Sequence, residues 1–145
     1  MGNRPIEVGL IGTTVEGRER GWTLSWNEIK ELVTTGEAVG FDSVWIPDHL
    51  IHEPGGVDPY GIWEACSLIS ALAAVTERVR IGPHVLCTGW RNPALIAKMA
   101  DTVDEISAGR LILALGAGWH EPEYRAFGFP FDHRIGRFAE ALAII

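Results

Sequence analysis

Asp48 and His49 are the residues of this chain whose types and spacing best suit chemistry. They closely follow a short apolar run, Ser43–Ile46, that stops at Pro47. In a parallel α/β barrel the carboxyl ends of the strands carry the catalytic groups, and this pair would lie at such an end. A histidine beside a carboxylate can exchange protons near neutral pH.

Spacing alone leaves three interpretations of this segment open. His49 could act as an acid/base group or contact a cofactor, held by its acidic neighbour. Asp48 and His49 could instead join His52 and Glu53 as metal ligands, since all three residue types bind metals. The segment could also be a solvated loop. The metal interpretation has the least support, because no second group of ligands follows another apolar run.

A second candidate is the segment Gly116–Glu121, which begins like a dinucleotide-binding fingerprint. The third glycine of that fingerprint is replaced by Glu121, which argues against a dinucleotide site. The glycines still allow the backbone to approach a flat ligand closely. Trp119 would then be a stacking wall, or else a buried residue of a tight turn.

The run that contains His84 and Cys87 carries no comparable signal from spacing. A single histidine in an apolar run is more often a core residue than a ligand. Cys87 is more often a small buried hydrophobe than a nucleophile. The chain has no Gly-x-Ser-x-Gly motif, so covalent catalysis has no support.

Strands and helices must alternate to position these groups. Four apolar runs each precede a segment with helical character: Ile6–Ile11, Ser43–Ile46, Val79–Leu86 and Leu111–Leu115. This alternation predicts a parallel α/β fold. The longest connections all follow strands rather than helices, at Thr13–Thr23, His49–Asp58 and Gly116–His133. Long loops on that side indicate the functional face.

Helix boundaries are signalled by capping residues. Ser25 and Glu28 form a capping box, and Gly40 predicts the end of that helix, whose inward face we expect to carry Ile29, Leu32, Val33 and Val39. Asp58-Pro59 and Asn92-Pro93 each place a capping side chain before a proline. We expect the third helix to end at Gly109 and to turn inward Ile96, Met99, Ala100, Val103 and Ile106. A fourth begins near Arg134.

Composition places the chain among ordinary globular proteins. It has 145 residues, of which 47% are hydrophobic and 21% charged. The net charge of −7 argues against binding nucleic acid or an anionic membrane. The two cysteines form no disulfide framework and suit a reducing cytoplasm. Four strand–helix units cannot close an eight-stranded barrel of about 250 residues. We therefore expect a single domain, 1–145, cut off in its fourth helix, with a missing second half or a homo-oligomer.

Five ordered segments together resemble the luciferase-like monooxygenase superfamily, from about Ile6 to the last residue: Gly40–Leu50, Ala71–Gly82, Arg91–Lys98, Ser107–Leu111 and Gly116–Gly128. The resemblance implies the first half of a (β/α)8 TIM barrel. It also implies an oxidoreductase that uses FMN with oxygen, or the deazaflavin coenzyme F420 for hydride transfer, on a small-molecule substrate. A non-catalytic, self-associating half-barrel is the alternative.

Site residues also follow from the resemblance. His49 matches the histidine near the cofactor ring and takes the catalytic role, and Asp48 matches the acid beside the cofactor. A cis peptide His84–Val85 is implied, with Val85 against the ring, Cys87 near its pyrimidine end and Gly118 approaching from the fourth strand. The Gly116–Gly128 segment slightly favours F420. Some relatives carry a glutamate proton donor where this chain has Trp119, so that role does not transfer.

Overall fold

The computed structural model describes residues 6–12, 14, 23–52 and 60–145. The strands are β1 (Gly9–Ile11), β2 (Ser43–Ile46), β3 (Ile51–His52), β4 (Tyr60–Gly61), β5 (Arg80–Pro83), β6 (Leu86–Cys87) and β7 (Leu115–Gly116). The helices are α1 (Trp26–Val39), α2 (Ala65–Ala73), α3 (Pro93–Ser107), α4 (Glu121–Phe127) and α5 (Arg134–Ile144), with a short 3-10 turn η1 (Thr88–Trp90). Within these ranges no helix has the length and apolar character needed to cross a membrane.

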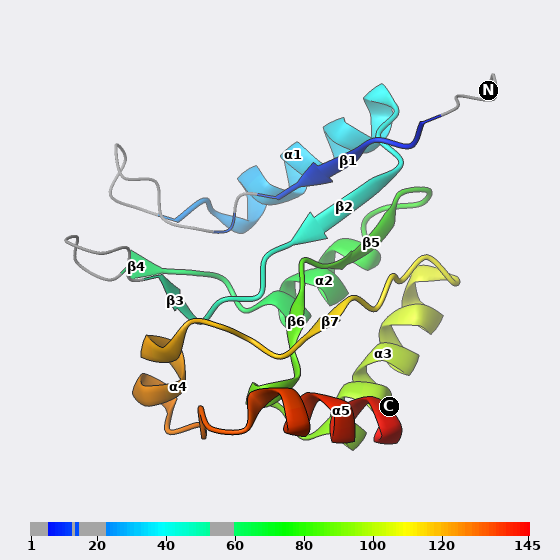
Figure 1. The fold of residues 1–145 in the computed structure, drawn as a ribbon. Helices are drawn as coiled ribbons and strands as arrows, with labels where there is room; N and C mark the ends of the chain where they lie inside the picture. Colours follow the sequence, from blue (N-terminus) through cyan, green and yellow to red (C-terminus); the bar gives the residue numbers. More distant parts are fainter. Residues whose placement is uncertain (1–5, 13, 15–22, 53–59) are drawn as a thin grey trace.

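The parallel strands follow one another with a helix between them, as the sequence predicts (Figure 1). β1, β2 and β5 form a parallel sheet in that order, and β6 pairs in parallel with β7. α1 connects β1 to β2, α2 lies between β2 and β5, and α3 lies between β6 and β7. β3 and β4 form a separate antiparallel pair beyond the end of β2. The carboxyl ends of the parallel strands therefore share one side of the molecule.

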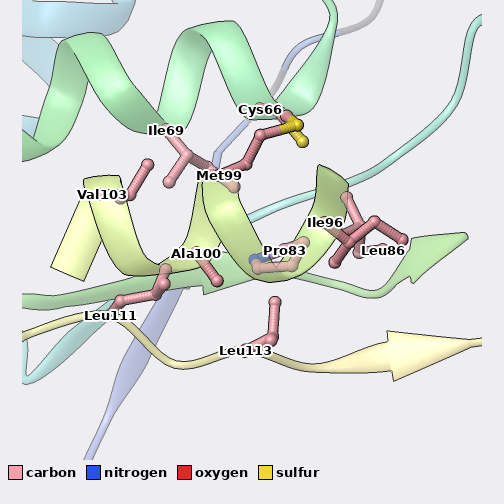
Figure 2. Close-up of a pocket in the computed structure, with 10 residues that line it drawn as sticks. All are labelled: Cys66, Ile69, Pro83, Leu86, Ile96, Met99, Ala100, Val103, Leu111 and Leu113. Atoms are coloured by element: carbon pink, nitrogen blue, oxygen red, sulfur yellow. The ribbon is translucent and has the colours of Figure 1, made fainter. Parts of the chain in front are cut away.

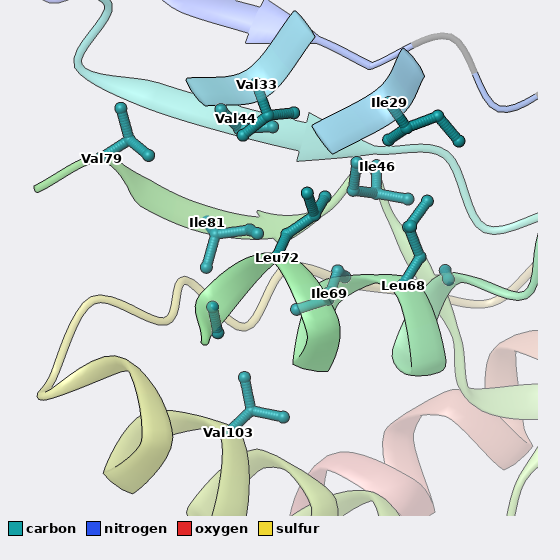
Figure 3. Packing of buried hydrophobic residues seen from close by; sticks show 12 residues of the cluster. Ile29, Val33, Val44, Ile46, Leu68, Ile69, Leu72, Val79, Ile81 and Val103 are labelled. Atoms are coloured by element: carbon teal, nitrogen blue, oxygen red, sulfur yellow. The ribbon is translucent and has the colours of Figure 1, made fainter. Parts of the chain in front are cut away.

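One face of the sheet carries the hydrophobic core. The register places Leu10, Val44 and Ile81 in one row, and side chains of α1 and α2 cover that row (Figure 3). Val33 and Leu72 on those helices are fully buried. Burying an aliphatic side chain of this size contributes about 1.5–3 kcal/mol, so this face fixes the strands firmly.

The opposite face is far less covered by the described residues. Ile11 stands in the row next to the core row and is 56% exposed. A barrel would place this face toward its interior, so the exposure is that of a partial barrel.

The helix caps predicted at Ser25, Gly40 and Asn92 are confirmed. Ser25 accepts from the backbone N–H of Glu28 while the Glu28 side chain accepts from the backbone N–H of Ser25. Gly40 follows α1 at φ 101°, a left-handed conformation that glycine adopts without strain. Asn92 caps α3, and α5 begins at Arg134. The cap predicted at Asp58-Pro59 lies outside the described residues; Glu64 caps α2.

Three predicted strands are shorter in the structure. The run Ile6–Ile11 forms a strand only over Gly9–Ile11. The run Val79–Leu86 divides into β5 and β6 on either side of His84–Val85. The run Leu111–Leu115 forms only a bridge between Leu111 and Ile81 before β7 begins. The carbonyl of Ile112 lies so close to Gly82 that any Cβ there would collide with it. The hydrophobic pattern predicts strands in these runs. It does not show where the hydrogen bonding between neighbouring strands is interrupted.

Parts of the predicted inward helix faces are wrong. Leu32, Val39 and Ile106 are 37%, 71% and 47% exposed. Val39 lies ten residues beyond Ile29, and Ile106 lies ten beyond Ile96. At 3.6 residues per turn, a residue ten positions further along has rotated away from the buried side of the helix. Helix α4 was not predicted, because its seven residues are too short to show a helical period.

Candidate active site

A cavity of about 490 Å³ lies at the carboxyl ends of β2, β6 and β7. It contains all six residues proposed from the sequence, and its full lining is Asp48, His49, His84, Val85, Cys87, Trp90, Gly116, Ala117, Gly118, Trp119, His120 and Glu123. A volume of this size is typical of small-molecule and cofactor sites. The fold therefore brings residues from three separate segments into one concave site.

A second, much smaller cavity lies between α2, α3 and the strands beneath them (Figure 2). Its volume is about 30 Å³, and its lining is almost wholly apolar. Burial raises the pKa of Cys66, on its edge, to about 12, so this thiol stays protonated and unreactive. The cavity is a gap in the packing of helices against strands and not a ligand site.

Asp48 is held by an ion pair behind the large cavity. Its carboxylate makes two parallel contacts with Arg91, at 2.7 and 2.8 Å, and accepts the backbone N–H of Cys87 at 2.7 Å. Arg91 also reaches Glu64, the cap of α2, at 2.8 Å. Burial lowers the pKa of Arg91, but the pairing with Asp48 outweighs burial and raises it. Asp48 thus ties β2 to β6 and fixes the backbone at Cys87.

Glu64 is the outer member of this network. Burial raises its pKa, but hydrogen bonds from Ser67, Arg91 and the N–H of Cys66 outweigh burial and hold the pKa at about 2. The carboxylate is therefore charged at any working pH. It stabilises both the amino terminus of α2 and the guanidinium of Arg91.

His49 is held by a buried acid from another part of the chain. Its Nδ1 lies 3.1 Å from Oε2 of Glu123, whose side chain is fully buried. The pKa of His49 is raised, mainly by this hydrogen bond; burial opposes the rise, and the charges of Glu123 and Asp48 add to it. The structure therefore gives His49 the surroundings of a proton-exchanging group near neutral pH.

The His84–Val85 peptide bond is cis, as the resemblance implied. His84 is exposed and faces Trp45 edge-on, so its interpretation as a core residue is wrong. Val85 is 44% exposed and also lines the cavity. A Cβ on Gly116 would lie 2.6 Å from Val85, so only glycine leaves room for that side chain.

Gly118 and Cys87 meet at the hydroxyl of Tyr124. The Tyr124 hydroxyl donates to the carbonyl of Ala117 at 2.8 Å and lies 3.0 Å from the Cys87 sulfur. Gly118 has φ 73°, and a Cβ there would collide with the Tyr124 hydroxyl. Cys87 is buried, and burial raises its pKa. These facts agree with its interpretation as a small buried residue.

Trp119 forms an open aromatic wall of the cavity. It is 65% exposed, so the alternative of a buried tryptophan in a tight turn is wrong. Its ring stands edge-on to His49 and His120, with centroids 5.8 and 5.0 Å away. An exposed indole beside an imidazole suits stacking against a flat ligand.

The metal interpretation gains no support. Among the described residues no group of three potential ligands could hold a metal ion. Glu53 lies outside those residues, while the Asp48 carboxylate is committed to Arg91 and to the Cys87 N–H.

Three important residues of the site were not assigned roles from the sequence. Glu123 and Tyr124 lie on the unpredicted helix α4, and Arg91 is only the first residue of Arg91–Lys98, one of the segments that carry the family resemblance. The available signal for α4 was Pro122, a residue favoured in the first turn of a helix, between the two acids Glu121 and Glu123. Contacts across 74 positions, such as His49 with Glu123, leave no local pattern.

The model of the family described as luciferase-like monooxygenase matches residues 6–145. This chain belongs to the luciferase-like monooxygenase family. It is 38% identical over 125 residues to an F420-dependent glucose-6-phosphate dehydrogenase of Amycolatopsis mediterranei, covering 81% of this chain and 36% of the relative. It is 36% identical over 141 residues to the pyrimidine monooxygenase RutA of Rhizobium rhizogenes, covering 88% and 38%.

A solved structure gives the same result for the fold. An F420-dependent secondary alcohol dehydrogenase, in complex with an F420-acetone adduct, superposes with a TM-score of 0.76 at 27% identity. The match covers 95% of this chain and 40% of that one. The chain thus spans about 40% of the length of the luciferase-like proteins it matches, and its fold is part of their TIM barrel. The family consists of oxidoreductases, so the non-catalytic alternative is not favoured.

Proposed function

We propose that this chain forms the cofactor-ring site of an oxidoreductase that acts on a small organic substrate. In this proposal the cavity at the strand ends holds the flat ring system of F420 or FMN, and His49 exchanges a proton with the substrate. The observation that carries it is the convergence of Asp48, His49, Val85 and Gly118 on one cavity within a chain of this family.

The lining fits the ring end of such a cofactor. Val85 offers an exposed apolar surface, Trp119 an aromatic wall and His49 a polar group that can be charged. The part of the lining that the structure describes contains no lysine or arginine, so it does not suit the phosphate end. When bound, the cofactor would supply hydride transfer or, for reduced FMN, oxygen chemistry. We assign phosphate binding to the part of the relatives' barrel that this chain does not span.

The residues of the site take distinct parts in this proposal. His84 and Val85 would support the ring from β5 and β6. Cys87 and Gly118 would border one end of it, held in place by the Tyr124 hydroxyl. Asp48 would lie beside the ring while its ion pair keeps the backbone of Cys87 in place.

We favour F420 over FMN by a small margin. The relative at 38% identity and the structure at 27% identity both carry F420 in their names, whereas the relative at 36% is a monooxygenase. We further propose a cytoplasmic homo-oligomer. Two unpaired cysteines support the compartment, and the exposed Val8 and Ile11 at the β1 edge support association.

Tryptophan fluorescence titration with F420 and with FMN tests the proposal. Trp119 and Trp90 line the cavity, so saturable quenching is expected when the ring binds. Gly116→Ala pushes against Val85 and should weaken binding by about tenfold, close to 1.4 kcal/mol. Gly136→Ala in α5, where a Cβ meets nothing within 4 Å, is the matched control and should bind normally. Absence of saturable quenching by both cofactors, or equal binding by the two variants, would contradict the proposal.

A further inference from the structure

Glu123 is a fully buried acid whose carboxylate bonds to three consecutive residues of the segment that follows β2. Its Oε1 accepts the backbone N–H of Leu50 at 2.5 Å and that of Ile51 at 3.2 Å. Its Oε2 faces Nδ1 of His49 at 3.1 Å. An unpaired buried carboxylate is strongly unfavourable, but here both oxygens have partners. Glu123 therefore ties α4 to the segment that carries the proposed catalytic histidine.

The contact with Oε2 decides which ring nitrogen of His49 carries the proton. A carboxylate only accepts hydrogen bonds, so the nitrogen that faces it must donate. In the neutral ring the proton then sits on Nδ1 and the lone pair on Nε2. Buried partners of this kind fix both the tautomer and the orientation of an imidazole.

We infer that Glu123 is a positioning residue for His49, keeping the proton on Nδ1 so that exchange with the substrate occurs at Nε2. The inference rests on the proposed function, in which His49 is the acid/base group. Nε2 takes a proton from a substrate O–H group, and the ring becomes an imidazolium. Its Nδ1–H remains hydrogen-bonded to the Glu123 carboxylate. The reverse transfer returns the proton from Nε2.

Several other titratable groups surround His49 and must be weighed against Glu123. Asp48 precedes it, and the ring of His120 lies 6.2 Å away. Among the described residues, the other titratable groups of the cavity and its walls include His84, Cys87 and Tyr124, with Arg91 and Glu64 behind Asp48. Among the influences on the pKa of His49, the hydrogen bond to Glu123 is the largest and the charge of Asp48 the smallest. Removing Glu123 should therefore change the pKa of His49 more than removing any other of these groups.

Nitrogen-15 NMR of the histidine rings tests the inference on the chain itself, with His49→Gln used to assign the His49 signals. At high pH the wild-type His49 should show the Nδ1–H tautomer. Glu123→Gln presents an amide N–H₂ or a neutral oxygen in place of the carboxylate. It should weaken proton binding by His49 about tenfold, which is one pKa unit. Glu121→Gln, an exposed acid in the same helix turn, makes the same charge change and should leave His49 unaltered.

Two results would overturn the inference: an Nε2–H tautomer in the wild type, or equal titration of His49 in the two variants. The wild-type tautomer decides the matter even if Glu123→Gln fails to fold. A chain that shows the Nδ1–H tautomer but binds neither cofactor contradicts the proposed function alone. A chain that binds cofactor with the Nε2–H tautomer contradicts this inference alone.

Discussion

The two ends of the parallel strands hold charged side chains in different ways. At the amino-terminal end, Arg110 donates to the carbonyls of Ala73, Thr76, Val79 and Ser107 and to the Thr76 hydroxyl. Near it, the carboxylate of Glu37 accepts the backbone N–H groups of Glu77, Arg78 and Val79. These charges are satisfied by the backbone of connecting loops.

At the carboxyl-terminal end, charged side chains meet one another around a cavity. Asp48 pairs with Arg91, and Glu123 pairs with His49. An imidazole can gain or lose a proton, and the pairing with Glu123 raises the pKa of His49. A backbone carbonyl has no proton to exchange. At the amino-terminal end, the charged side chains contribute to stability alone. The other end couples stability to the protonation of a residue that faces the cavity.

The largest expected effect is on stability at the amino-terminal end. Arg110→Ala leaves several carbonyls without a donor and should lower the free energy of unfolding by about 3–4 kcal/mol. Urea unfolding measures it, with the exposed Arg125→Ala as control. The titration of His49 should not change in any Arg110 variant that folds. A changed titration would show that the two ends are not independent.

Asp48→Asn should cause the next largest loss of stability. It should lower the free energy of unfolding by about 3 kcal/mol, because it leaves the guanidinium of Arg91 poorly paired. The matched control is Asp101→Asn, which breaks an exposed pair with Lys98 on α3. That control should change stability very little. Equal unfolding midpoints for the two variants would show that the Asp48 pair has no special role in holding β2 to β6.

Two glycine substitutions should change the free energy of unfolding in opposite directions. Gly118→Ala forces a positive φ on alanine and presses on the Tyr124 hydroxyl, so it should destabilise by about 2 kcal/mol. Gly136→Ala, in the first turn of α5, should stabilise by about 0.5 kcal/mol. Thermal unfolding of both variants checks the pair. A neutral Gly118→Ala would mean that the Tyr124 hydroxyl does not close this side of the cavity.

The smallest expected effect is a dependence of the free energy of unfolding on pH. The pKa of His49 is raised above its ordinary value of 6.5, so its pairing with Glu123 adds stability in full below that value. This part of the stability is lost as the pH rises through the raised pKa. The stability difference between wild type and Glu123→Gln should therefore be larger at pH 5.5 than at pH 9. A difference independent of pH would contradict the pairing.

Local signals in the sequence predicted much of the fold. The box at Ser25 and Glu28, the stop at Gly40 and the cap at Asn92 each depend on neighbours within four positions, and each is confirmed. The interruption of the third strand near Val85 and the exposure of Ile106 depend on packing between distant segments. Hydrophobic pattern alone cannot show either.

The site shows the same division. All six residues proposed from the sequence line one cavity. Asp48 and His49 were predicted from their place after an apolar run, whereas His84, Val85, Cys87 and Gly118 followed from the family resemblance. Arg91 and Glu123, which hold Asp48 and His49, lie 43 and 74 positions away from them. Only the fold shows that these residues are partners.

The most direct test of the account is NMR of the histidine side chains during titration with F420 and with FMN. Binding of the ring in the cavity predicts that His49 and His84 shift with a common saturation curve. His133, on the exposed start of α5, should not shift. Unchanged His49 and His84 signals at saturating cofactor, or a shift confined to His133, would contradict the assignment of this cavity to the cofactor ring.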